Sequence, residues 1–128
     1  MKKLIKLTVI SLLTTIVFSS CNREEERSTT YTFIQNSALP IVSHHEIELI
    51  EFNENTRVVT HRFNSDNNTN KVFTARSGST AVKIRFVMVT VGGTRSAASW
   101  HPQVFRLNNG GNINIHFHNV NGVPHEPF

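Results

Sequence analysis

The chain has 128 residues, of which 38% are hydrophobic and 9% aromatic, a length that suffices for one domain. Three of its lysines lie in the first six residues, so the chain from residue 21 onward carries ten basic and nine acidic residues, a balance that gives no reason to expect a nucleic-acid partner. The single cysteine excludes an intramolecular disulfide, so a domain of this size depends on the packing of its own core.

The N-terminus has the pattern of an export signal. A cationic head over residues 1–6 precedes a mostly apolar stretch over residues 7–18, and Ser20 and Cys21 follow shortly after it. The apolar stretch is shorter than the roughly 20 residues that a membrane span needs, and no stop-transfer pattern follows. We therefore predict a signal peptide over residues 1–20 that is removed from the mature protein.

The segment Phe18-Ser19-Ser20-Cys21 resembles the lipobox of bacterial lipoproteins, in which small residues precede a cysteine, although leucine is more usual where Phe18 stands. The resemblance implies cleavage between Ser20 and Cys21, a diacylglycerol on the Cys21 sulfur, and acylation of the new amine by a fatty acid such as palmitate. Stable anchoring requires more than one acyl chain, because each buried methylene contributes only about 0.8 kcal/mol. The alternatives are a secreted protein with a free thiol and an uncleaved N-terminal membrane helix.

Residues 21–29 comprise the lipidated cysteine and a polar tether without apolar periodicity, a composition that predicts disorder. Within the tether, Glu24, Glu25 and Glu26 resemble the surface-export signal of Bacteroidota lipoproteins, and Asn22 is not the aspartate that marks inner-membrane retention in enteric bacteria. The resemblance implies a lipoprotein in the outer membrane of a Gram-negative bacterium, displayed at the cell surface. The alternative is that the three acids belong to a simple spacer.

From residue 30 onward, short runs rich in valine, isoleucine, threonine and phenylalanine alternate with turn residues, and no window has a helical period. The pattern predicts an all-β fold: one β-sandwich domain over residues 30–128, immunoglobulin-like or transthyretin-like, with a small barrel as the alternative. We also expect a polar loop over residues 66–70. The predicted strands cover residues 30–36, 45–52, 57–63, 71–75, 80–91, 94–107 and 113–119.

Two turns organise the second half of the domain. The strand over residues 80–91 has apolar side chains at its even positions, which predicts one buried face. The pair Gly92-Gly93 predicts a hairpin that returns through Ser99-Trp100. The pair Asn109-Gly110 predicts a second hairpin that leads into the last strand.

The layout of the domain, which opens with Tyr31-Thr-Phe-Ile-Gln-Asn36 and has a long strand before Gly92-Gly93, resembles small lipoproteins of Bacteroidota, a resemblance that implies no activity. We expect a non-enzymatic, lipid-anchored binding or accessory module at the outer membrane. Its partners would be the membrane, through Cys21, and an unidentified protein or glycan. We expect it to be monomeric and to need no cofactor.

Histidines suggest a second hypothesis, a metal-binding module. His116 and His118 would share one face of a strand, as two metal ligands must, but zinc sites use three or four protein ligands. A third ligand would have to come from another histidine through the fold. We therefore predict no tightly bound metal. The other histidines are His44, His45, His61, His101 and His125.

A third hypothesis, a small envelope enzyme, has the least support. No serine lies in a nucleophile-elbow motif, and we expect no catalytic residue. Glu46 and Glu48 share one strand face, where we expect them to be solvated rather than to act as a glycosidase pair. Trp100 and His101, with the nearby Tyr31 or Arg95, are candidates for an exposed aromatic ligand platform, and the alternative is that Trp100 fills the sandwich core.

Overall fold

A computed structural model of the chain describes residues 27–118 and 121–128, so the predicted signal peptide, Cys21 and the acidic residues 24–26 lie outside the described residues. The described residues form strands and turns without a helix. The strands are β1 (Thr30–Gln35), β2 (Val42–Phe52), β3 (Arg57–Ser65), β4 (Thr69–Thr74), β5 (Ala81–Thr90), β6 (Ser99–Trp100), β7 (Phe105–Arg106) and β8 (Asn112–His116).

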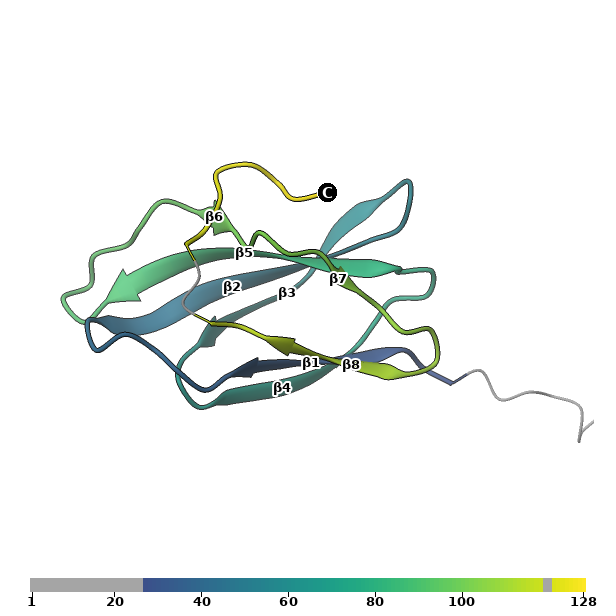
Figure 1. Cartoon of the computed structure of the whole chain (residues 1–128), viewed down its shortest axis with the longest axis horizontal. Helices are drawn as coiled ribbons and strands as arrows, with labels where there is room; N and C mark the ends of the chain where they lie inside the picture. Colours follow the sequence, from purple (N-terminus) through teal and green to yellow (C-terminus); the bar gives the residue numbers. More distant parts are fainter. Residues whose placement is uncertain (1–26, 119–120) are drawn as a thin grey trace, which may run out of the picture.

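The strands form two sheets that pack face to face (Figure 1). One is three-stranded in the order β4-β1-β8, with β1 antiparallel to β4 and parallel to β8. The other is five-stranded in the order β3-β2-β5-β6, and β7 also pairs with β5. This architecture confirms the predicted all-β sandwich. In an immunoglobulin domain of the type with seven strands the first two strands share a sheet, whereas β1 and β2 lie in different sheets here.

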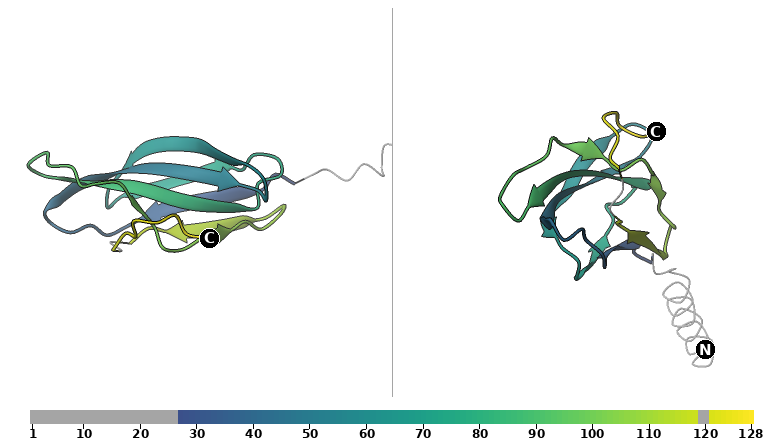
Figure 2. Two further views of the ribbon diagram at one scale, coloured as in Figure 1. Left: turned by 90° about the horizontal axis from the view of Figure 1, so that it is seen from above. Right: turned by 60° about the vertical axis from the view of Figure 1, so that its left-hand side comes forward.

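Aromatic rings pack between the sheets. Figure 2 shows the backbone of the two sheets from two further directions. The Phe33 ring meets Phe63 edge-on with 5.1 Å between centroids and lies 5.6 Å from Phe117. Phe86 meets Phe117 edge-on at 5.2 Å. On the predicted face of β5, Val82, Ile84 and Phe86 are buried in this core, whereas Met88 is half-buried. The buried core residues are Tyr31, Phe33, Ile47, Leu49, Val82, Ile84, Phe86, Phe105, Ile115 and Phe117.

The segment after β5 differs from its prediction. The turn at Gly92-Gly93 is tight, with the Gly93 N–H donating to the Thr90 carbonyl at 2.9 Å, and it leads to β6, which pairs antiparallel with β5 as predicted. The single strand predicted over residues 94–107 is wrong, because pairing to β5 is limited to the short β6 and β7 and an isolated bridge between Arg95 and Val89. Pro102 lies between them, and proline lacks the N–H that a continuous ladder requires.

The second predicted hairpin is also wrong. The turn at Asn109-Gly110 is present, and the Gly111 N–H donates to the Asn108 carbonyl at 2.8 Å. It does not join paired strands, however, because β7 belongs to the five-stranded sheet and β8 pairs with β1 in the other. A turn sequence specifies that the chain reverses direction. It does not specify which strand the following segment pairs with. The predicted loop over residues 66–70 is shorter than expected, since β4 begins at Thr69.

A buried carboxylate joins the two sheets near one end of β1. Glu51, on β2, is 1% exposed, and its Oε2 accepts a hydrogen bond of 2.7 Å from the Tyr31 hydroxyl on β1. Its Oε1 accepts from the Arg76 backbone N–H at 2.7 Å and from the Ser79 hydroxyl at 2.8 Å. Burial alone would raise the pKa of Glu51, but these hydrogen bonds outweigh it and lower the pKa below its ordinary value. Burial, with the neighbouring Glu51, raises the pKa of Tyr31.

A second polar bridge joins the sheets at the other end of β1. The Gln35 amide nitrogen lies 3.3 Å from His45 Nδ1 on β2, and the Gln35 carbonyl oxygen accepts a hydrogen bond from the Ser65 hydroxyl on β3. All three side chains are buried. Burial lowers the pKa of His45, with a smaller contribution from His44, so the neutral imidazole is favoured in the fold. β1 is therefore tied to β2 at both of its ends.

The C-terminal residues 121–128 lie against the outer face of the five-stranded sheet. The backbones of Val123 and Trp100 exchange hydrogen bonds of 2.8 and 2.9 Å. Glu126 binds Arg57 and also Lys83, whose Nζ lies 2.9 Å from the carboxylate and 4.4 Å from the centre of the Phe52 ring. Lys83 is only 3% exposed, although alternation along β5 places it on the face opposite the core.

We predict that Tyr31→Phe destabilises the fold by about 1–3 kcal/mol, because it leaves a buried carboxylate oxygen without its donor. The pKa of folded Glu51 lies below the unfolded value, so this group contributes stability above pH ~4.5 that is lost as the pH falls through the folded pKa. The variant should raise that folded pKa toward the unfolded value, so the acid-dependent loss of stability should be smaller and should end at a higher pH. Urea unfolding across a pH series measures both effects.

The matched control is Phe73→Leu. Phe73 packs 5.6 Å from the Tyr31 ring but has no hydrogen bond to the carboxylate. This variant should lower the free energy of unfolding without moving the acid-dependent part of the curve. An identical pH dependence in Tyr31→Phe and Phe73→Leu would contradict the role given to the hydroxyl.

Candidate functional site

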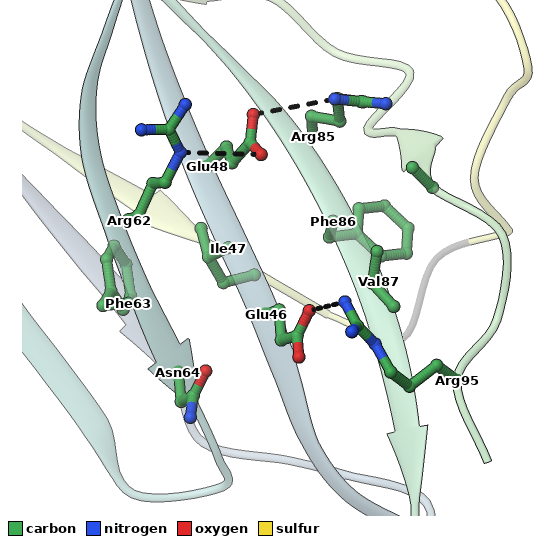
Figure 3. A pocket seen from close by; sticks show the side chains of 11 residues that line it. Glu46, Ile47, Glu48, Arg62, Phe63, Asn64, Arg85, Phe86, Val87 and Arg95 are labelled. Atoms are coloured by element: carbon green, nitrogen blue, oxygen red, sulfur yellow. Dashed lines mark hydrogen bonds and ion pairs between the residues drawn. The ribbon is translucent and has the colours of Figure 1, made fainter.

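The outer face of the five-stranded sheet carries a row of alternating charges. Pairing of β2 with β3 and β5 places Glu48 opposite Arg62 on one side and Arg85 on the other (Figure 3). Glu48 lies 3.7 Å from the Arg62 Nε and 3.8 Å from an Arg85 terminal nitrogen. One row further along the strands, Glu46 binds Arg95. These side chains line a shallow depression of about 470 Å³.

The arginines of this depression are free to reach a ligand. The side chains of Arg62, Arg85 and Arg95 are 71%, 45% and 60% exposed. The contacts of Glu48 with Arg62 and Arg85 exceed hydrogen-bond length, so both guanidinium groups retain N–H donors for another acceptor. The two glutamates hold the three arginines over one surface, and exposed ion pairs of this kind add little stability.

Apolar groups lie beside the charged row. Val87, on β5, and Ala98, just before β6, line the same depression. Trp100 is paired with Arg85 across β5 and β6, so its side chain lies on the same face of the sheet as the arginine. A ligand here would meet guanidinium donors next to small apolar patches, an arrangement suited to carboxylate, carbonyl or hydroxyl acceptors on a peptide or glycan.

Glu46 and Glu48 share one partly exposed face, as the sequence predicted. Sequence reasoning named Arg95 beside Trp100 but missed Arg62 and Arg85. Arg62 and Arg85 are far apart in the chain, and only the registers of β3 and β5 against β2 bring them to the same carboxylate. The sequence held one signal for Arg62. It precedes the apolar Phe63 in an alternating strand, so its side chain is expected on the face opposite Phe63.

The exposed aromatic platform of Trp100 and Tyr31 is a wrong prediction. Tyr31 is fully buried, and its hydroxyl binds Glu51 inside the core. Trp100 is half-buried on the short β6 and does not belong to the core cluster, so the alternative that it fills the core is wrong as well. Pairing of β6 with β5 places Trp100 at the sheet surface.

The His116 and His118 rings are stacked, with 6.1 Å between centroids and 7° between planes, and both residues are exposed. Across residues 27–118 and 121–128, no group of three or more histidine, cysteine or acidic side chains could hold a metal ion. His101 is buried, and its Nδ1 accepts the Gln103 N–H at 3.1 Å. Burial lowers the pKa of His101, the Gln103 bond partly opposes that effect, and nearby His118 lowers it further.

Ser20 and Cys21, the predicted cleavage and lipidation residues, lie outside the described residues. None of the described residues belongs to a helix long and apolar enough to cross a membrane. No protein-family model matches the chain, and neither a curated protein nor a solved structure matches it.

We predict that His116 and His118 bind zinc or copper only weakly, because two imidazoles fall short of the three or four ligands of a tight site. Binding should weaken on acidification, since a protonated imidazole does not ligate a metal. Titration calorimetry measures the affinity, with His125→Ala as the matched control. Stoichiometric binding at submicromolar affinity that His116→Ala abolishes would favour the metal-binding hypothesis instead.

Proposed function

We propose that this protein is a non-enzymatic, lipid-anchored binding module in the outer membrane of a Gram-negative bacterium. The anchor is assigned to Cys21, on the strength of the cationic and apolar residues before it and the lipobox-like residues 18–21. The acidic residues 24–26 favour display at the cell surface. The tether over residues 21–29 then leads to the sandwich, which begins with β1.

The observation that supports a binding role is the row Arg62–Glu48–Arg85. In this row one carboxylate holds two exposed guanidinium groups that retain free donors. A planar guanidinium binds carboxylates and other paired acceptors in a defined geometry. We assign the ligand to the class of acceptor-rich polymers, a peptide or glycan segment at the cell envelope.

The anchor is tested by Cys21→Ala. The variant should lose membrane attachment and fatty-acid label, because the acyl chains on Cys21 provide the proposed anchor. Metabolic labelling with an alkyne analogue of palmitate, followed by membrane fractionation, measures both. Ser19→Ala is the control, since it keeps a small residue before the cysteine and should remain labelled. Label that persists on Cys21→Ala would end the proposal of a lipid anchor at this residue.

The binding surface is tested by the double variant Arg62→Gln, Arg85→Gln. Backbone resonances of the ¹⁵N-labelled protein are followed during titration with a set of acetylated tetrapeptides and envelope-type disaccharides. A ligand should shift resonances around Glu48, and the double variant should weaken its binding by about tenfold or more, because charge-assisted hydrogen bonds contribute about 1.5–3 kcal/mol. Arg106→Gln, which removes an exposed arginine outside the depression, should leave the affinity unchanged. Shifts confined to another face would refute this assignment.

A further inference from the structure

One edge of the three-stranded sheet is open. β8 is the terminal strand of the order β4-β1-β8, and β1 is its one partner among the described residues. The Gly111 carbonyl accepts the Thr30 N–H at 2.9 Å, and the Phe117 N–H donates to the Ile34 carbonyl at 2.8 Å. Backbone groups of successive strand residues point to opposite sides.

The backbone N–H and C=O groups of the residues between Gly111 and Phe117 therefore point alternately toward β1 and away from it. Ile113 and Ile115 direct their N–H and C=O groups toward β1, whereas Asn112, Asn114 and His116 direct theirs away from it. Within residues 27–118 and 121–128, no group bonds to the backbone of these three outward residues. Unpaired groups in a row of this kind form a template for another strand.

The other sheet edges carry the protections that natural proteins use against such pairing. β3 has a register shift where it meets β2 at Leu49 and Ile50, and it bears Arg57 and Arg62. β4 bears Lys71. β6 is two residues long, and its Trp100 backbone is already bonded to the C-terminal segment.

β8 has none of these protections. It is five residues long, and residues 107–118 contain no charged residue of the Asp, Glu, Lys or Arg type and no proline. Its sequence, Asn112-Ile-Asn-Ile-His116, reads as a near-palindrome around its central asparagine. An antiparallel copy of the same strand would meet it with matching residue types and without like charges.

We propose that β8 pairs antiparallel with β8 of a second copy of this chain, about a two-fold axis at Asn114. Asn114 would face its own copy, Asn112 would face His116, and Ile113 would face Ile115. The three outward residues of each strand would form three hydrogen-bonded pairs, or about six hydrogen bonds. A two-fold interface of this type uses the same patch on both subunits.

The pairing also continues the core. Ile113 lies on the inner side of β8 with the buried Ile115, but it is only half-buried. The second copy would place its own β8 beside Ile113 and cover part of its exposed surface. The two sheets would become one, in the order β4-β1-β8-β8-β1-β4. The chain would then be a homodimer rather than the monomer that the sequence predicts.

The test is site-specific disulfide trapping in the full chain, in membranes of the expressing cells, with copper-phenanthroline as oxidant. Directly paired residues of a hydrogen-bonded antiparallel pair have Cα atoms about 5.5 Å apart, within the roughly 4.4–6.8 Å that a disulfide spans. Asn114→Cys should therefore give a linked dimer on a non-reducing gel. Asn70→Cys, exposed on the opposite edge of the sheet, should not. The unsubstituted chain, whose single cysteine is Cys21, is the control for any linking that does not involve the introduced cysteine.

A second variant separates strand pairing from chance collision. His116→Pro removes an N–H that faces away from β1 and leaves the Phe117 N–H free to bond Ile34. Added to Asn114→Cys, it should reduce the linked dimer at least about tenfold while the protein keeps its resistance to protease. Equal linking at Asn70→Cys, or no linking at Asn114→Cys, would overturn the proposal. A linked product of the mass expected for a different partner would also overturn it.

Discussion

The buried carboxylate of Glu51 is the constraint on which the rest of the sandwich depends. A charged group inside a core is costly unless hydrogen bonds replace its water. Glu51 receives donors from β1, through Tyr31, and from the segment between β4 and β5, through Arg76 and Ser79. These three donors come from two separate parts of the chain, and the carboxylate itself lies on a third, β2. The carboxylate is therefore satisfied only when both sheets and this connection are in their native positions.

The same constraint determines what reaches the surface. Alternation along β2 places His45, Ile47, Leu49 and Glu51 inside and Glu46 and Glu48 outside. A slip of one residue would expose the apolar set and bury the two outer glutamates. With this face of β2 turned outward, the registers of β2 against β3 and β5 align Glu48 with the arginines of those strands. The candidate binding surface is thus a consequence of the core.

The sequence predicted the features that depend on local pattern and missed those that depend on pairing. Alternation identified β5 and its buried face, and Gly92-Gly93 identified the hairpin to β6. The alternation of β2 puts Glu51 on the same face as the core residues of that strand. A charged residue, however, is ordinarily expected at the surface. The arginine row and the burial of Lys83 could not be predicted, because registers and the path of the C-terminal segment bring their partners together.

The parallel pair of β1 and β8 has a kinetic consequence. β1 is synthesised first in the domain and β8 last, so one side of β1 stays unpaired until almost the whole domain is available. Contacts that are this distant in sequence slow folding, because the intervening chain must lose entropy before they form. For a chain proposed to be exported to the outer membrane, this topology delays completion of the core. Translocation would then act on an extended, incompletely folded polypeptide.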